Sequence, residues 1–217
     1  INLLKRLESS VHSFRLTLKR IQDLICSTLD TIAHYDPSLT LELNDLTSTV
    51  DFDADDQEMD LFTVGKKVKI ALEDMDYVTW QHDLEEDFNT LYVLVNMVAD
   101  ITPEHDSKLQ MLLSTISEKI DNPINPGNRK VIIFTAFSDT AEYLYDHVST
   151  FAQDKYGLHT ALVTGSVSGR TTVPKFKADL NNVLTCFSPI SKDKAAPMPD
   201  GPDIDLLIAT DCISEGQ

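Results

Sequence analysis

The first part of the chain carries apolar side chains at steps of three and four positions. This spacing places them on one side of a helix, so we predict a long amphipathic helix from Leu4 to about Ala33. The segment 34–37 ends it, because proline cannot continue a helix and disfavours helical geometry in the residue before it. The apolar stripe consists of Leu4, Leu7, Val11, Phe14, Leu18, Ile21 and Ile25.

The same periodicity returns twice further along the chain. Leu84, Phe88, Leu91, Val95 and Val98 share one face of a second helix. A third helix opens at Thr102-Pro103 and carries Leu109, Leu112, Leu113, Ile116 and Ile120. With the first helix, these elements predict an antiparallel bundle or arm.

The acidic segment 51–60 has no regular apolar period, so we expect an exposed loop there. An acidic cluster also suggests calcium. This segment, however, lacks the central glycine and the closing glutamate of the common calcium-binding loop, so we expect no metal site.

A dense turn signal at 122–128 divides the chain, and the pattern after it changes to short apolar strands that alternate with helices. We therefore predict a helical bundle or insertion segment over 1–121 and an α/β domain over 122–217. Continuous apolar strands of this kind indicate a parallel sheet with helices on both faces. The expected order is a strand at 130–135, a helix capped near Ser138, a strand at 159–163, a helix at 173–183, a long Pro-rich loop at 188–202 and a strand at 205–209.

Charge and composition narrow the possible partners. The net charge is −17 over 217 residues. Residues 1–121 hold 10 Lys and Arg against 24 Asp and Glu, and residues 122–217 hold 8 against 11. A chain this acidic should bind nucleic acid weakly by itself, since phosphate binding normally uses a basic face.

The chain contains no apolar run long enough to cross a membrane, so we expect no membrane partner. Its three cysteines lie far apart in the sequence, without metal-binding or disulfide spacing. This pattern is typical of reduced thiols, and we expect a cytoplasmic protein. The cysteines are Cys26, Cys186 and Cys212.

Ligands of open parallel sheets collect at the carboxyl ends of the strands, where loops and helix N-termini present N–H groups to anions. Three such ends follow the expected strands. They read Phe134-Thr135-Ala136-Phe137-Ser138, Val163-Thr164-Gly165-Ser166 with Arg170 soon after, and Ala209-Thr210-Asp211 leading to Ser214-Glu215-Gly216-Gln217.

In their order and spacing these segments resemble motifs IV, IVa and V of superfamily 2 helicases. The last of them looks most like the bacterial Swi/Snf-like group. The resemblance covers roughly residues 129–217 and implies the second RecA-like lobe of an ATP-dependent DNA helicase or translocase, truncated here after motif V. A helical segment before this lobe is similar to the insertions that this group carries between its motor lobes.

The resemblance also implies roles for single residues. The nucleic-acid backbone, expected to be double-stranded DNA, would contact Thr135, Ser138, Thr164, Gly165, Arg170 and Thr210. Glu215 and Gly216 would lie near the cleft where the first lobe of the complete protein brings ATP. Each residue also has a structural alternative. Ser138 and Asp211 can be helix caps, and Arg170 can form a surface ion pair.

The chain lacks the phosphate loop, the magnesium-binding carboxylates and the arginine finger of a complete phosphoryl-transfer site. We therefore expect no complete catalytic site in this chain, with ATP and Mg²⁺ bound only when the first lobe is present. The alternative interpretation is a non-catalytic interaction module, in which the apolar stripe of the helical segment docks a partner protein on an α/β scaffold.

Overall fold

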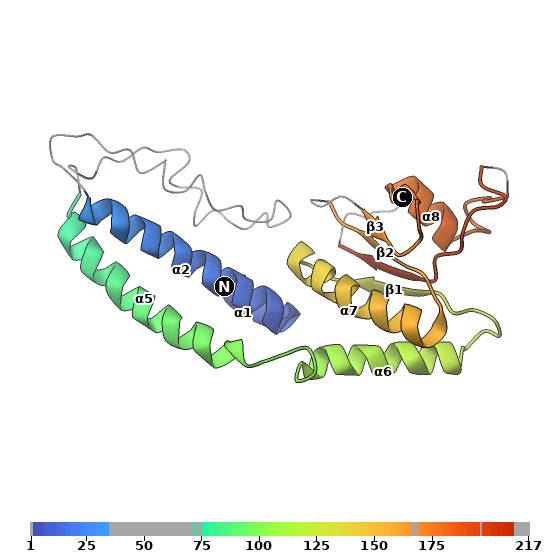
Figure 1. Cartoon of the computed structure of the whole chain (residues 1–217), viewed down its shortest axis with the longest axis horizontal. Coiled ribbons are helices and arrows are strands. Elements are labelled where there is room, and N and C mark those ends of the chain that lie inside the picture. Colours follow the sequence, from blue (N-terminus) through green and yellow to red (C-terminus); the bar gives the residue numbers. More distant parts are fainter. Residues whose placement is uncertain (1, 35–71, 73–74, 166–168, 196, 211–217) are drawn as a thin grey trace. The chain divides into compact units, whose positions relative to one another are not determined.

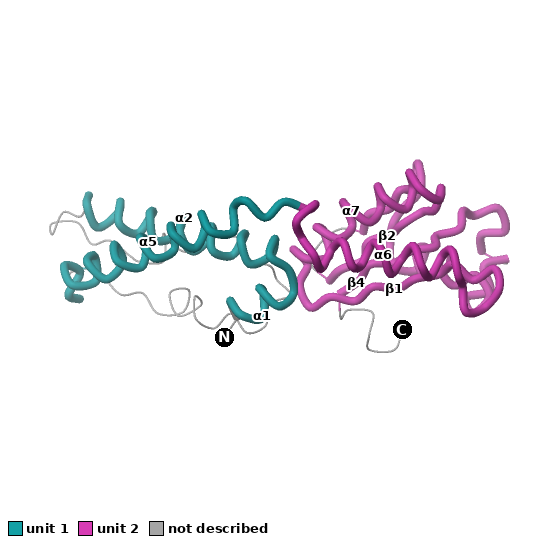
Figure 2. Tube along the Cα trace, turned by 90° about the horizontal axis from the view of Figure 1, so that it is seen from below, with its two compact units in different colours: residues 1–102 teal, residues 103–217 magenta. Residues whose placement is uncertain are grey.

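The computed structural model describes residues 2–34, 72, 75–165, 169–195 and 197–210 (Figure 1). The chain forms two compact units, residues 1–102 and 103–217 (Figure 2). The described part of the first unit is helical, and the second unit contains the sheet. The acidic loop expected at 51–60 lies outside the described residues.

The first unit begins with two helices where the sequence predicted one. Helix α1 (Asn2–Ser9) and helix α2 (Val11–Ala33) are separated by Ser10, which has extended backbone angles (φ −158°, ψ 149°). The Ser10 hydroxyl accepts a hydrogen bond from the amide of Ser13 at 3.0 Å and so caps α2. The prediction of an unbroken helix was wrong here because a serine that caps a new helix outweighs a continuous apolar period.

Helix α2 packs along helix α5 (Tyr77–Ala99), and Figure 1 shows the two running in opposite directions. Their shared core uses the predicted faces of both helices. Leu18 is fully buried, so truncating it should leave a cavity that costs about 2–5 kcal/mol. The buried residues of this core are Phe14, Leu18, Ile25 and Leu91, with Leu84, Phe88, Val95 and Val98 packed against them.

The second unit is built on a four-stranded sheet with the order β1-β4-β2-β3. Strands β1 (Val131–Phe134), β4 (Leu206–Ala209) and β2 (Thr160–Val163) are parallel, and the short β3 (Arg170–Thr171) runs antiparallel to β2. The α/β class predicted from the sequence is therefore confirmed, with a mixed sheet that is mostly parallel. Strand β3 was not predicted, because two residues are too short for a periodic signal.

Helices cover both faces of this sheet, with α8 (Leu180–Phe187) on one side and α7 (Ser138–Tyr156) on the other (Figure 1). Side chains of β4 alternate between the two cores. Leu206 and Ile208 pack with Ala141, Tyr145 and Val148 of α7. On the other face, Leu207 packs with Val183, Leu184 and Cys186 of α8. This alternation explains why the strand is apolar at every position.

Helix α6 (Ser107–Asp121) belongs to the second unit, although the sequence analysis placed it in the first segment. Its Ile116 and Ile120 are buried in the same core as α7. It starts a turn later than expected, because Asp106 is its N-cap and accepts hydrogen bonds from the amides of Lys108 and Leu109. The same carboxylate accepts a hydrogen bond from the Tyr143 hydroxyl of α7 at 3.0 Å, which ties the two helices together.

Helix α8 begins at Leu180, later than the start near Val173 that the sequence indicated. Asp179 caps it by accepting a hydrogen bond from the amide of Asn182 at 3.0 Å. Residues 172–179, between β3 and this helix, are not helical, so the predicted helix at 173–183 is correct only from Leu180 onward.

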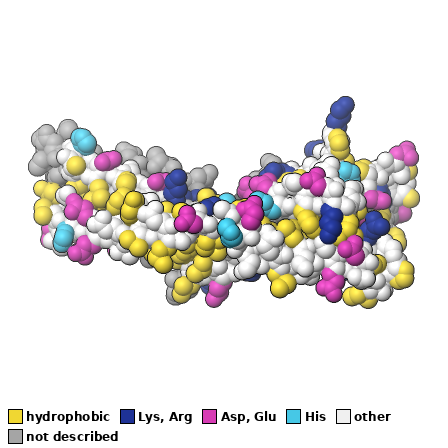
Figure 3. Space-filling model, turned by 60° about the horizontal axis from the view of Figure 1, so that its bottom comes forward, with side chains coloured by type: hydrophobic (Ala, Val, Ile, Leu, Met, Phe, Trp, Pro, Cys, Tyr) yellow, Lys and Arg dark blue, Asp and Glu magenta, His cyan; other side chains and the backbone are white. Residues whose placement is uncertain are grey.

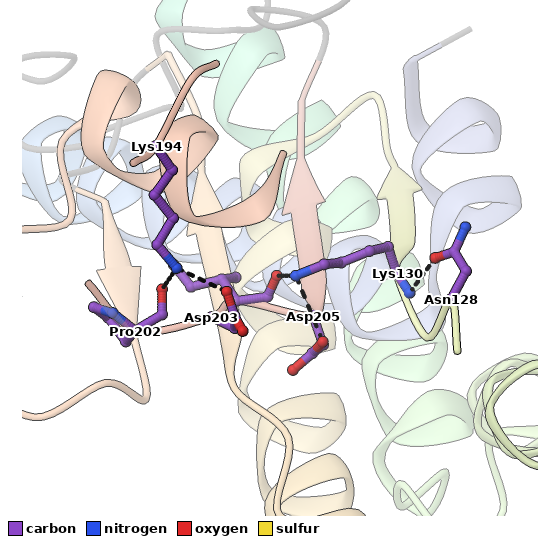
Figure 4. Close-up of polar contacts among 7 residues, drawn as sticks. Asn128, Lys130, Lys194, Pro202, Asp203 and Asp205 are labelled. Atoms are coloured by element: carbon purple, nitrogen blue, oxygen red, sulfur yellow. Dashed lines mark hydrogen bonds and ion pairs between the residues drawn. The ribbon is translucent and has the colours of Figure 1, made fainter. Parts of the chain in front are cut away.

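Two lysines fix the chain as it enters β4 (Figure 4). Lys194 is buried, and its ammonium group donates hydrogen bonds to the Pro202 carbonyl at 2.8 Å and to Asp203 Oδ1 at 2.7 Å. Lys130, directly before β1, donates to the Ile204 carbonyl at 2.7 Å. The long loop is therefore attached to the sheet by side-chain contacts, which help to hold β4 in place.

Candidate functional site

Three threonines lie side by side at the carboxyl ends of the parallel strands. The strand register puts Phe134, Ala209 and Val163 in one row, so the next residues, Thr135, Thr210 and Thr164, form the following row. The backbone ladder continues into this row. The amide of Thr135 donates to the Ala209 carbonyl at 3.0 Å, and that of Thr210 donates to the Val163 carbonyl at 3.3 Å. We call this row the carboxyl edge.

The edge is partly open to solvent. The side chains of Thr135 and Thr164 are half-buried, Gly165 is exposed, and Thr210 is 3% exposed. The amides of Thr135 and Thr210 are used within the sheet, so the threonine hydroxyls are the donors relevant to a ligand. Hydroxyl groups can donate hydrogen bonds to phosphate oxygens without distinguishing one base from another. The structure thus brings together, at one edge of the sheet, four residues that the sequence analysis selected from three separate segments: Thr135, Thr164, Gly165 and Thr210.

Helix α7 begins beside Thr135, and its first turn holds Ser138. The N-cap is Phe137, which makes no side-chain capping bond. The expected cap at Ser138 was therefore wrong, because Ser138 is the first residue of the helix and is fully buried. Its neighbour Asp139 is also buried in the first turn, where a carboxylate is stabilised by the positive end of the helix dipole.

Arg170 points away from the carboxyl edge. It pairs with Leu162 across β2 and β3, which places it on the α7 side of the sheet. There its guanidinium group contacts Asp146 Oδ1 at 2.9 Å and lies 4.6 Å from the ring centre of Tyr145. The surface ion pair that the sequence left open as an alternative is thus present. Both charged side chains are about half exposed (45% and 57%), so the pair should add well under 1 kcal/mol to stability.

Tyr145 was missed by the sequence analysis, since only its place in the fold puts it under Arg170. Burial raises the pKa of its hydroxyl, while the charge of Arg170 acts in the opposite direction. This tyrosine links the ion pair to the core of the α7 face, because its side chain is 5% exposed.

Gly169 is a further position that the sequence did not single out. A β-carbon built there would lie 1.9 Å from the carbonyl oxygen of Ala178, which leaves room for glycine alone. The close approach holds Gly169, directly before β3, against Ala178, two residues before α8, and so fixes the strand that carries Arg170.

The remaining motif residues, Asp211, Glu215 and Gly216, lie outside the described residues. Within the part of the chain that the structure describes, no group of three His, Cys, Asp or Glu side chains could hold a metal ion. No helix in that part is long and apolar enough to span a bilayer.

Comparisons with known proteins add no family to this geometry. The chain matches no protein-family model, no curated protein and no solved structure. The functional argument therefore depends on the residues and on their arrangement.

Proposed function

We propose that this chain is the second motor lobe of an ATP-dependent DNA helicase or translocase of the superfamily 2 type, and that its carboxyl edge holds the phosphate backbone. The observation that carries the proposal is the row of Thr135, Thr210 and Thr164. These residues come from three segments that resemble motifs IV, V and IVa, and the sheet order brings them to one place.

The strand order supports the proposal because it places the three motif-like segments on neighbouring strands. Strand β4 lies between β1 and β2, so the last segment in sequence is central in space. A backbone-binding row needs donors at regular intervals, and adjacent strands supply them about 4.8 Å apart. Contacts of this kind track a phosphate backbone without reading its sequence.

Arg170 has a more restricted role in this proposal than the resemblance implies. Its guanidinium group is engaged with Asp146 and Tyr145 on the α7 side. A phosphate would have to displace Asp146 to reach it. The net binding at the carboxyl edge therefore depends on neutral donors, which agrees with the weak affinity expected for an acidic chain.

The chemistry of ATP belongs to the complete protein in this proposal. ATP and Mg²⁺ would bind when the first lobe supplies its phosphate loop and carboxylates, with Glu215 and Gly216 near the shared cleft. This chain by itself is then expected to be inactive as an ATPase. Its own residues bind and orient the nucleic acid, and the cytoplasm is the proposed location.

A titration of the isotope-labelled chain with a short DNA duplex at low salt, followed by amide NMR, tests the proposal. We expect shift changes at Thr135, Thr164 and Thr210, and none at the opposite end of the strands, at Lys130 and His159. A change of Thr164 to Val should weaken binding about five- to tenfold, because one neutral phosphate hydrogen bond contributes on the order of 1 kcal/mol.

The matched control is Thr115→Val, which removes an exposed hydroxyl from α6 in the same unit. It should leave the affinity for the duplex unchanged. Shift changes that cluster at the amino ends of the strands, or no changes at the highest duplex concentration, would contradict the proposal.

The alternative function is a protein-interaction module. Most of the stripe that was expected to dock a partner packs inside the first unit, where Phe14, Leu18 and Ile25 contact α5. Leu4 and Leu7 of α1, which belong to the same stripe, are 66% and 41% exposed and are the part of it left for such a role.

A further inference from the structure

Lys177 is an exposed cation beside the carboxyl edge. It belongs to the segment between β3 and α8, and its side chain is 85% exposed. Two observations place this segment at the end of the edge. A β-carbon built at Gly169 would lie 1.9 Å from the Ala178 carbonyl oxygen, so the two backbones are in close contact. Ala178 also packs against the core cluster that contains Val163, the residue directly before Thr164.

The row of threonines on the carboxyl edge leads toward this segment. In the sheet order β1-β4-β2-β3, the three threonines follow β1, β4 and β2 in turn. Strand β3 comes next, about 4.8 Å further on, and its pairing of Arg170 with Leu162 puts Gly169 level with Val163. A phosphate backbone that lies along the threonines and continues past β2 would therefore come to Gly169 and to the segment that holds Lys177.

The ammonium group of Lys177 is available to a phosphate at little cost. It lies 3.6 Å from Asp179 Oδ2, which is too long for a hydrogen bond. Asp179 does not depend on this contact, because its carboxylate accepts hydrogen bonds from the amide and the side chain of Asn182 at 3.0 and 2.8 Å. Arg170 differs, since its guanidinium group is 2.9 Å from Asp146. The loosely held lysine can therefore exchange a carboxylate for a phosphate more readily than this arginine can.

Position distinguishes Lys177 from the other cations of the second unit. Lys and Arg side chains reach the surface of this unit at several places (Figure 3), so exposure alone selects none of them. Lys130 and Lys194 are held at the amino ends of the strands, where they donate to the carbonyls of Ile204 and Pro202. Lys177 lies at the opposite end of the strands, beside the residues that the proposed function uses.

We propose that Lys177 makes a charged phosphate contact that extends the carboxyl edge past β2. The inference rests on the proposed function, because it adds one cation to a row of neutral hydroxyl donors. Each phosphate that a lysine neutralises on B-DNA releases counterions and adds about 0.9 to the steepness with which log K falls with log salt. Hydroxyl groups carry no charge and add no such dependence. Lys177 thus gives the binding a salt dependence that the threonines alone would not give.

Fluorescence anisotropy of a labelled short DNA duplex, titrated with the full chain at about 20–200 mM salt, tests this contact. Lys177→Gln should weaken binding about three- to tenfold at the lowest salt and make the salt dependence shallower by about one unit of slope. Lys177→Arg, which keeps the charge, should restore both the affinity and the slope. Thr164→Val should weaken binding and leave the slope unchanged.

Lys192→Gln is the matched control, because it makes the same charge change at an exposed lysine in the loop before β4. It should leave the affinity and the slope as in the wild type. Equal losses in Lys177→Gln and Lys192→Gln would overturn the inference, since net charge alone would then explain them. If Lys177→Gln binds like the wild type while Thr164→Val binds more weakly, the inference fails and the proposed function does not. If neither variant changes the binding, both are wrong.

Discussion

Changing Lys194 to Met should loosen the entrance to the central strand β4. The substitution keeps the aliphatic stem of the side chain and removes the ammonium group, which donates to the Pro202 carbonyl and to Asp203 Oδ1. The stem itself packs near Gly201, where a β-carbon would lie 3.3 Å from Lys194 Cε. The variant therefore tests the two polar contacts with little change in packing.

The structure sets the size of the effect. Hydrogen bonds to a charged group typically contribute about 1.5–3 kcal/mol each, but the Asp203 side chain is 68% exposed and water screens that contact. Neither acceptor is left buried when the ammonium group is removed, since Pro202 is half-buried and Asp203 exposed. We expect the variant to lose about 1–2 kcal/mol of unfolding free energy.

Hydrogen exchange measured by mass spectrometry is the suitable assay, because it reports on the segment 188–209 separately from the helical unit. Amides of the loop and of the first residues of β4 should exchange about five- to thirtyfold faster in the variant. Lys192→Met is the control, as Lys192 is an exposed lysine in the same loop. Equal exchange in Lys194→Met and the wild type, or equal acceleration in the control, would refute the reasoning.

The same contact predicts a dependence on pH. The hydrogen bond from Lys194 lowers the pKa of the Asp203 carboxyl below its ordinary value of 3.8. A carboxyl with a lowered pKa in the folded state contributes stability above its ordinary pKa and loses it as the pH falls through the lowered value. The difference in exchange between the wild type and Asp203→Asn should therefore be present at pH 6 and shrink below about pH 4.

Four other substitutions test the fold, each by urea unfolding. Thr160→Val should raise the free energy of unfolding by about 1 kcal/mol, because the buried Thr160 hydroxyl has no hydrogen-bond partner among the described residues. Thr172→Val should lower it by about 1 kcal/mol, because the Thr172 hydroxyl accepts a hydrogen bond from the Thr160 amide at 3.0 Å. Gly169→Ala should cost about 1–3 kcal/mol through its clash with Ala178. Asp106→Ala should cost about 2–3 kcal/mol, from a lost helix cap and the lost hydrogen bond from the buried Tyr143 hydroxyl. Unchanged unfolding midpoints would contradict each of these contacts.

Periodicity and turn chemistry were enough to predict the main elements. The four-residue strands at Val131, Thr160 and Leu206 each lie within a strand predicted from a continuous apolar run. Helices α2 and α5 follow their predicted apolar faces, and α2 ends at Ala33. These signals are local, because a buried strand or helix face imposes its own spacing on the sequence.

Contacts between distant segments were beyond this kind of reasoning. The side of the sheet on which Arg170 lies depends on β3, whose pairing with β2 has no periodic signal. The membership of α6 in the second unit depends on Ile116 and Ile120 packing in the α7 core. For the candidate site, the sequence indicated each threonine singly. Their alignment in one row follows from the strand order, which no local pattern encodes.

The central place of β4 has a consequence for how the chain reaches its folded state. Strands β1 and β2 do not pair with each other, and each pairs with β4, which comes last in the sequence. Residues Val131 and Leu206, far apart along the chain, must meet before the parallel sheet can form. Distant pairings of this kind slow folding, because the entropy of closing the loop is lost before the contacts form. Synthesis proceeds from the N-terminus, so the first helical unit can fold before β4 has been made. The cores on the two faces of the sheet cannot form until β4 is synthesised.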